Sequence, residues 1–103
     1  MRIGFKMKVF EGKHIEYKKR HENVFPDLEI LLKEAGVHNY SIFLDQETNT
    51  LFGFAEIDSL DKWNKISEKE ICKKWWEYMK DIMETNQDNS PVSIDLKEVY
   101  HLD

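Results

Sequence analysis

The segment VHNYSIFLDQETNTLFGFAEID, residues 37–58, predicts a β-hairpin around which the rest of the chain can be placed. Residues 37–45 and 50–58 are rich in β-branched and aromatic residues, and the polar QETN between them is typical of a turn. Successive side chains of a strand point to opposite faces of a sheet. The hairpin is therefore expected to present apolar side chains on both of its faces.

The alternation assigns the apolar residues of the hairpin to faces. In the first strand, one face is expected to carry Val37 and Phe43, and the other His38, Tyr40, Ile42 and Leu44. In the second strand, Phe52 and Phe54 alternate with Leu51, Ala55 and Ile57. A sheet that is apolar on both sides must be buried on both sides.

The segments before the hairpin predict one strand and two helices. Alternating apolar residues indicate a strand over residues 2–10. After Gly12 the chain is rich in helix formers up to about Glu22, which indicates a first helix. Pro26 suits the first turn of a second helix, and Gly36 is a natural terminator for it.

The segments after the hairpin predict helices and a last strand. Ser59 is a suitable N-cap for a short helix, and residues 68–83 have the pattern of a long amphipathic helix. LKEVYHL, residues 96–102, is expected to form the last strand. The order of strand, helices, hairpin, helices and strand matches the α+β, ferredoxin-like βαββαβ plan, here with each helical crossover split in two.

The length of 103 residues predicts one domain, residues 1–103, with a single core. Helices on one side of the sheet would leave the opposite apolar face uncovered, and no further segment is available to cover it. We therefore expect a homodimer in which two copies pack sheet on sheet.

The composition narrows the function classes. The net charge of −5 argues against a nucleic-acid-binding surface, which would be basic. No run of about 18 apolar residues is present, so no membrane span is expected. The N-terminus lacks the apolar core of a signal peptide, and the lone Cys72 cannot form an internal disulfide. Together these features favour a cytoplasmic protein.

Tyr17 and His21 are the first candidates for chemistry, because they lie one helical turn apart and should project from the same side of the first helix. The lysines around them are also compatible with an ordinary solvated helix. The zinc motif with two histidines four residues apart fails, since Phe25 stands at the second position. We therefore expect no metal site here.

Three further aromatic residues allow a structural and a functional reading. Trp75 and Trp76 point about 100° apart on a helix, so they belong to neighbouring apolar rows. Either both rings are simply buried in the core, or one of them lines a cleft, where its flat aromatic face would suit a sugar. Tyr40 is expected to point inward, where its hydroxyl would bond to backbone, water or a ligand. Cys72 lies on the apolar face of its helix and is interpreted as a packing residue.

Four segments of the chain resemble one known family. YKKRH, HNYSIFLD, CKKWWEYM and DNSPVSIDLKEV occur in the same order and at matching separations in the L-rhamnose mutarotase family. The resemblance covers essentially the whole chain. It implies a small dimeric α+β barrel, an isomerase that interconverts the α and β anomers of L-rhamnose without a metal or an organic cofactor.

The resemblance also implies roles for the candidate residues. The family's proton-donor histidine falls on His21, and its sugar-contacting tyrosines fall on Tyr17 and Tyr40. Its tryptophan pair falls on Trp75 and Trp76. His21 is expected to protonate the ring oxygen of the sugar, and His21 itself, Tyr17 or a bound water could serve as the base.

Two other functions are compatible with the sequence. A cofactor-free monooxygenase could share the same dimeric barrel, since a fold does not fix a chemistry. Alternatively, the chain could be a sugar-binding or dimerisation module without catalytic activity.

Overall fold

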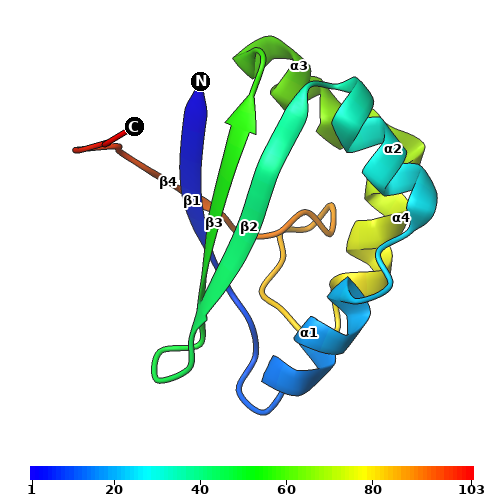
Figure 1. Ribbon diagram of the computed structural model, residues 1–103. Coiled ribbons are helices and arrows are strands. Elements are labelled where there is room, and N and C mark those ends of the chain that lie inside the picture. Colours follow the sequence, from blue (N-terminus) through cyan, green and yellow to red (C-terminus); the bar gives the residue numbers. More distant parts are fainter.

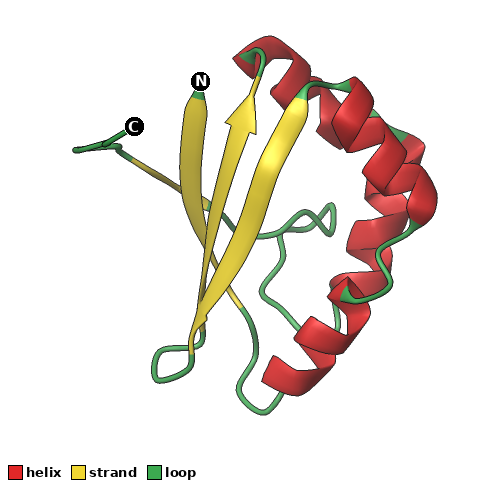
Figure 2. Cartoon of the chain, in the orientation of Figure 1, coloured by secondary structure: helices red, strands yellow, loops and turns green.

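The computed structural model describes residues 1–103, which form four strands, four α-helices and one 3-10 turn. In chain order the elements are β1 (Arg2–Lys8), α1 (His14–His21), α2 (Pro26–Glu34), β2 (Val37–Asp45), β3 (Thr50–Ile57), α3 (Leu60–Lys65), η1 (Ile66–Glu68), α4 (Glu70–Met79) and β4 (Ile94–Leu96). The helices all lie on one face of the sheet (Figure 1). Figure 2 shows that the opposite face of the sheet carries no helix.

The four strands form one antiparallel sheet in the order β2-β3-β1-β4. β1 lies inside the sheet, where it pairs with β3 on one side and with β4 on the other. The hairpin pairs β2 with β3 along its length. This arrangement confirms the predicted α+β, ferredoxin-like fold.

Local signals at the helix ends also behave as predicted. Pro26 is the first residue of α2, and Gly36 beyond its end adopts a φ of +83°, which favours glycine. The Ser59 hydroxyl accepts a hydrogen bond of 3.1 Å from the Lys62 backbone N–H and so caps α3.

The helix-covered face of the sheet is closely packed. Leu51, Ala55 and Ile57 of β3 are fully buried there. Gly53 lies between them because a Cβ at this position would stand 2.5 Å from two ring carbons of Phe5, well inside a van der Waals contact. The absence of a side chain at Gly53 therefore makes room for the Phe5 ring under the helices.

A β-bulge in β2 corrects the predicted faces of that strand. Asn39 adopts a φ of 51°, and the pairing register shifts between His38 and Ser41. The extra residue reverses the alternation at this point. Val37 therefore lies on the helix-covered face together with Ile42, Leu44 and Tyr40, whereas His38 shares the open face with Phe43. The prediction that paired Val37 with Phe43, and Tyr40 with His38, was wrong.

Three predicted boundaries also shift. β1 ends at Lys8. α4 ends at Met79, and the apolar residues that follow it, Ile82 and Met83, are buried in a turn, where Met83 forms a β-bridge with Val9. The last strand covers only Ile94–Leu96, not residues 96–102. Its pairing with β1 ends where Leu96 lies opposite Gly4, and residues 97–103 continue from there as exposed, irregular chain. No helix of the chain has the length and apolar character needed to cross a bilayer.

Candidate active site

α1 holds Tyr17 and His21 on the same side, as their spacing predicted. Their rings stack with centroids 4.3 Å apart and planes inclined by 25°. The His21 Nδ1 lies 2.9 Å from the backbone carbonyl oxygen of Tyr17. A carbonyl oxygen can only accept a hydrogen bond, so Nδ1 carries the proton and the neutral ring leaves Nε2 with a free lone pair.

The surroundings of His21 favour this neutral form. Burial lowers the pKa of His21 below its ordinary 6.5, and the bond to the Tyr17 carbonyl offsets only part of that effect. The imidazole is therefore neutral near pH 7. Nε2 can accept a proton from a bound molecule and return it, which is the behaviour of a general acid/base.

α4 supplies the aromatic wall beside His21. The Trp75 ring meets the imidazole edge to face, with centroids 5.3 Å apart and planes at 88°. Phe25, at the start of α2, meets Trp75 in the same way at 5.0 Å, and Tyr78 closes the group at 5.6 Å from Trp75. These four rings come from α1, from α4 and from the N-cap residue of α2.

Tyr17 and Tyr40 bring two phenol hydroxyls to the covered side of the sheet. The rings around Tyr40 exclude enough water to raise the pKa of its hydroxyl to about 12, although 37% of the residue remains exposed. Burial, and secondarily the nearby Tyr40, raises the pKa of Tyr17 well above its ordinary value. Both groups therefore remain protonated at neutral pH. The Tyr17 hydroxyl makes no hydrogen bond within the chain. Every fully buried side-chain oxygen or nitrogen of the chain does have a hydrogen-bond partner, so the Tyr17 hydroxyl is not fully buried. It must face space that water or a ligand can reach.

Trp63 of α3 packs between Tyr40 and the core residue Phe5. Its ring lies 6.1 Å from the Tyr40 ring and 6.0 Å from the Phe5 ring. Trp63 and Phe25 were not among the predicted site residues, because each is a single aromatic residue in or beside a short element. The only available signal was their size, since aromatic rings of that area are rarely left without a packing role.

Trp76 lies apart from this group. It packs against the part of the core that contains Leu28, Ile66 and Cys72. It also lines an open surface hollow, whose other residues include Lys73, Glu77, Asp88 and Asn89. The structure therefore brings Tyr17, His21 and Trp75 together and does not place Trp76 with them. A sugar contact of Trp76 stays a prediction.

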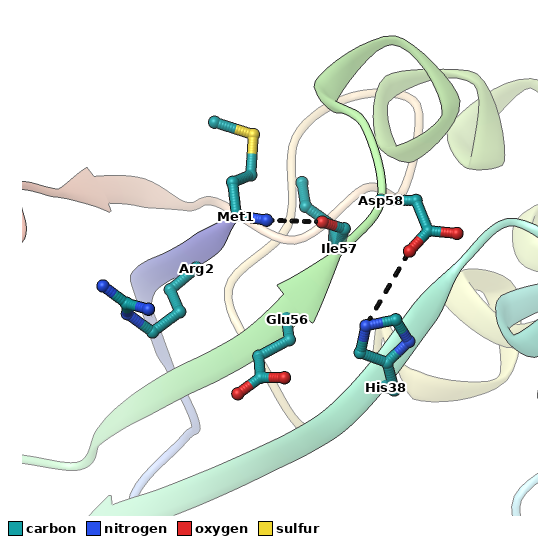
Figure 3. Close-up of a pocket in the computed structure, with 6 residues that line it drawn as sticks. All are labelled: Met1, Arg2, His38, Glu56, Ile57 and Asp58. Atoms are coloured by element: carbon teal, nitrogen blue, oxygen red, sulfur yellow. Dashed lines mark hydrogen bonds and ion pairs between the residues drawn. The ribbon is translucent and has the colours of Figure 1, made fainter. Parts of the chain in front are cut away.

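Two other features of the chain carry groups that could take part in chemistry. Cys72 is buried, and burial raises the pKa of its thiol to about 11, which fits the predicted packing role. A hollow at one end of the sheet contains the half-exposed pair of His38 and Asp58, 3.8 Å apart. Figure 3 shows that Met1, Arg2, Glu56 and Ile57 form the rest of its lining. That hollow contains no phenyl, phenol or indole ring and none of the predicted site residues.

Comparison with known proteins agrees with the predicted family. Residues 2–102 match the family model described as L-rhamnose mutarotase. The L-rhamnose mutarotase of Lachnoclostridium phytofermentans is 55% identical over 103 residues, which cover 100% of this chain and 99% of that protein. The L-rhamnose mutarotase of Oceanobacillus iheyensis is 54% identical over 102 residues, with 99% and 98% covered.

Solved structures give the same result at the level of the fold. A crystal structure of an L-rhamnose mutarotase from Formosa agariphila superposes with a TM-score of 0.93 at 48% identity, covering 100% of this chain and 99% of that one. A putative antibiotic biosynthesis monooxygenase from Nitrosomonas europaea superposes with a TM-score of 0.64 at 13% identity, covering 97% of this chain and 100% of that one. At such low identity, the similarity concerns the fold alone. With these matches over its full length, the chain belongs to the L-rhamnose mutarotase family.

Proposed function

We propose that this chain interconverts the α and β anomers of L-rhamnose, with His21 as the acid/base group. Membership of the L-rhamnose mutarotase family supports the activity. The observation that supports the role of His21 is its geometry, because a neutral imidazole with a free Nε2 is held between two aromatic rings. Residues 1–103 would act as one catalytic domain.

The reaction requires only the movement of protons. A pyranose changes its anomer when the hemiacetal opens, the free aldehyde turns about one bond, and the ring closes from the other side. The anomeric hydroxyl loses a proton, and the ring oxygen gains one. No electrons leave the sugar and no group is transferred. One positioned acid/base group is therefore sufficient.

In the proposed cycle, His21 begins as the base. Nε2 accepts the proton of the anomeric hydroxyl, whose O–H electrons form the C=O bond of the aldehyde while the bond from C1 to the ring oxygen breaks. The resulting imidazolium then donates its proton to the ring oxygen. Both oxygens are attached to the anomeric carbon, so the same nitrogen can serve both. Delivery to the ring oxygen is the proton donation that the family resemblance implies for His21.

The surrounding residues would hold the sugar. The protonated hydroxyls of Tyr17 and Tyr40 can donate hydrogen bonds to sugar oxygens and accept them from sugar hydroxyls. The Trp75 ring offers an apolar surface to the carbon side of the pyranose and to its methyl group. Trp76 is retained as a second contact on the basis of the family resemblance.

A homodimer is part of the proposed function. The open face of the sheet carries a set of exposed apolar side chains, namely Phe43, Phe52, Phe54, Ile94 and Leu96. A second copy of the same face would cover them, as in aligned sheet packing. The lone cysteine suits a reducing compartment, so we place the dimer in the cytoplasm.

Exchange of magnetisation between the anomers of L-rhamnose, measured by NMR, tests this function. The protein should accelerate the exchange above its spontaneous rate. His21→Ala should lower the catalysed rate about a hundredfold to ten-thousandfold, the usual contribution of general acid/base catalysis. His101→Ala, which removes an exposed histidine of the C-terminal tail, is the matched control and should leave the rate unchanged. Sugar binding without accelerated exchange would identify a binding module instead.

A further inference from the structure

α1 is held in place mainly by a few side chains. At eight residues it is too short to be a stable helix by itself. Its backbone packs only sparsely on the other helices and strands. Its position must therefore depend on contacts of individual side chains, among which Tyr17 is buried in the core and His14 bonds to Asn49 at 2.7 Å.

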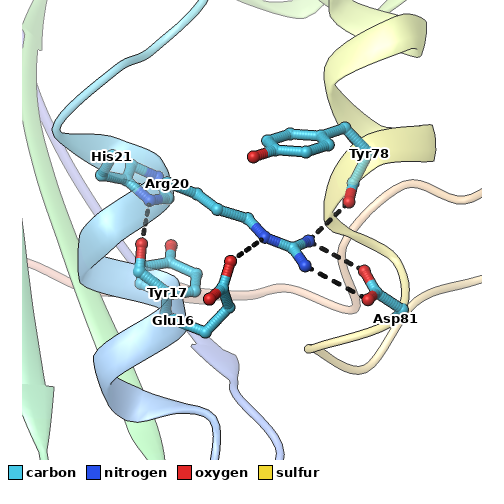
Figure 4. A network of polar contacts seen from close by, with 6 residues as sticks. All are labelled: Glu16, Tyr17, Arg20, His21, Tyr78 and Asp81. Atoms are coloured by element: carbon cyan, nitrogen blue, oxygen red, sulfur yellow. Dashed lines mark hydrogen bonds and ion pairs between the residues drawn. The ribbon is translucent and has the colours of Figure 1, made fainter.

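Arg20 makes the most extensive of these contacts. Its Nη1 donates to the Tyr78 carbonyl oxygen at 2.6 Å and to Asp81 Oδ1 at 2.8 Å, and its Nη2 donates to Asp81 Oδ2 at 3.2 Å. Its Nε donates to Glu16 Oε2 at 2.8 Å within α1. The guanidinium carbon also lies 4.6 Å from the centre of the Tyr78 ring. Figure 4 shows the guanidinium reaching from α1 to the end of α4.

This arrangement uses features that only arginine offers. The two parallel bonds to Asp81 need a planar fork, and the stacking on Tyr78 needs a flat cation. The Arg20 side chain is only 12% exposed, whereas the Asp81 side chain is 63% exposed, so the guanidinium is sheltered but the carboxylate remains in contact with water. Arg20 thereby connects α1 to the last turn of α4, where the main-chain carbonyl of Tyr78 is free to accept.

The same part of α4 forms the wall of the candidate site. Trp75 stands one turn before Tyr78 on that helix and meets His21 edge to face. His21 follows Arg20 directly on α1. A displacement of α1 from α4 would therefore separate the imidazole from the Trp75 ring.

We propose that Arg20 is a positioning residue, which binds Asp81 and the Tyr78 carbonyl and so holds α1 on α4 with His21 against Trp75. Arg20 does not touch the reacting atoms in this account. The inference rests on the proposed role of His21 and adds the contact that keeps His21 in place.

The titration of His21 offers a readout of its position. Burial is the main reason for its lowered pKa, and no charged side chain contributes to the shift. Tyr17 and Trp75, the groups against the ring, are both uncharged near pH 7. Release of α1 would expose the imidazole to water and raise its pKa toward 6.5. The direct electrostatic effect of removing the Asp81 charge has the opposite sign, because a nearby anion favours imidazolium.

Asp81→Asn therefore separates the two effects in one variant. We expect the NMR titration of the His21 imidazole to move to higher pH, and kcat for anomer exchange to fall about tenfold to a hundredfold, the scale of a misplacement of about 1 Å. Arg20→Lys keeps the charge but loses the fork, and should shift both quantities in the same direction. Asp61→Asn removes a carboxylate from an exposed pair with Lys65 on α3 and should change neither.

Each alternative outcome has a distinct meaning. A folded Asp81→Asn variant whose His21 titration stays unchanged or moves to lower pH would overturn the proposal, and so would a raised pKa with full activity. If Asp81→Asn does not fold, as judged by circular dichroism, Arg20→Lys tests the proposal through the same two measurements, the His21 titration and kcat for anomer exchange. A shifted titration together with an active His21→Ala variant would keep the positioning contact but refute the acid/base role of His21, so the two failures can be distinguished.

Discussion

The two faces of the sheet are built from the same alternating strands but have different roles. The covered face contains Tyr40 and Phe5 beneath helices that contribute His21, Trp75 and Trp63. The open face presents apolar side chains that nothing in the chain covers. Strand alternation alone cannot distinguish these faces. What separates them is the layer of helices, which adds titratable and aromatic groups to only one face.

The comparison predicts that chemistry and assembly can be disrupted separately. Changes on the covered face should alter anomer exchange or the stability of the core. Changes on the open face should alter the association of two copies and leave the geometry around His21 intact.

The largest effect is expected for the open face. Phe43 is 69% exposed in the single chain, and Phe43→Ser removes its ring from the proposed interface. Burial of a phenylalanine contributes about 1.5–3 kcal/mol, and a symmetric dimer contains the change twice, so dissociation should become about 3–6 kcal/mol easier. Sedimentation at several concentrations would measure the new dissociation constant.

Ile15→Ser is the matched control for this change. Ile15 is 85% exposed on α1, which lies on the covered side, so its loss should leave the dimer intact. An unchanged dissociation constant in Phe43→Ser would show that the open face is not the interface.

An intermediate effect is expected from one added methyl group on the covered face. The Cβ of Gly53→Ala would stand 2.5 Å from the Phe5 ring, and overpacking of this kind usually costs about 1–3 kcal/mol. The free energy of unfolding in urea should fall accordingly. Gly4→Ala adds the same group on the open face, where the nearest atoms of the chain are 3.7 Å away. Because Gly4 lies beside Phe54 and Leu96 of the proposed interface, both variants are compared at concentrations that dissociate the dimer, and Gly4→Ala should then leave the stability of the single chain unchanged. Equal stability of both variants would contradict the difference in packing between the faces.

A smaller effect should distinguish the two tryptophans. Trp75→Phe weakens the edge-to-face contact with His21, and an aromatic pair of this type contributes about 0.5–1.5 kcal/mol. We expect kcat for anomer exchange to fall by up to about tenfold. Trp76→Phe should lower kcat less, because Trp76 lies on the neighbouring row of α4. The reverse order would show that Trp76 is the ring that serves His21 and its substrate.

Much of the fold was predictable because its signals are local. The alternation in β3, the proline that begins α2 and the serine that caps α3 each act within a few residues. Tyr17 and His21 were also predictable as a pair, since residues one turn apart on a helix share a side. Their chemical role came from the family resemblance.

The features that were missed depend on distant contacts. The bulge at Asn39 interrupts an alternation that looks continuous in the sequence. α4 was predicted too long because Ile82 continues the apolar period, although it is buried in a turn. Arg20 and Asp81 are 61 residues apart, and nothing in the spacing of charged residues shows that they meet.

The pH dependence of anomer exchange tests the role of the covered face most directly. NMR would measure both the exchange rate, corrected for the spontaneous reaction, and the titration of His21. The neutral imidazole must accept the first proton, and its pKa lies below 6.5. We predict a kcat/KM that is constant near neutral pH and falls about tenfold per pH unit below the measured pKa of His21. A rate that stays constant or rises as His21 becomes protonated would contradict the account.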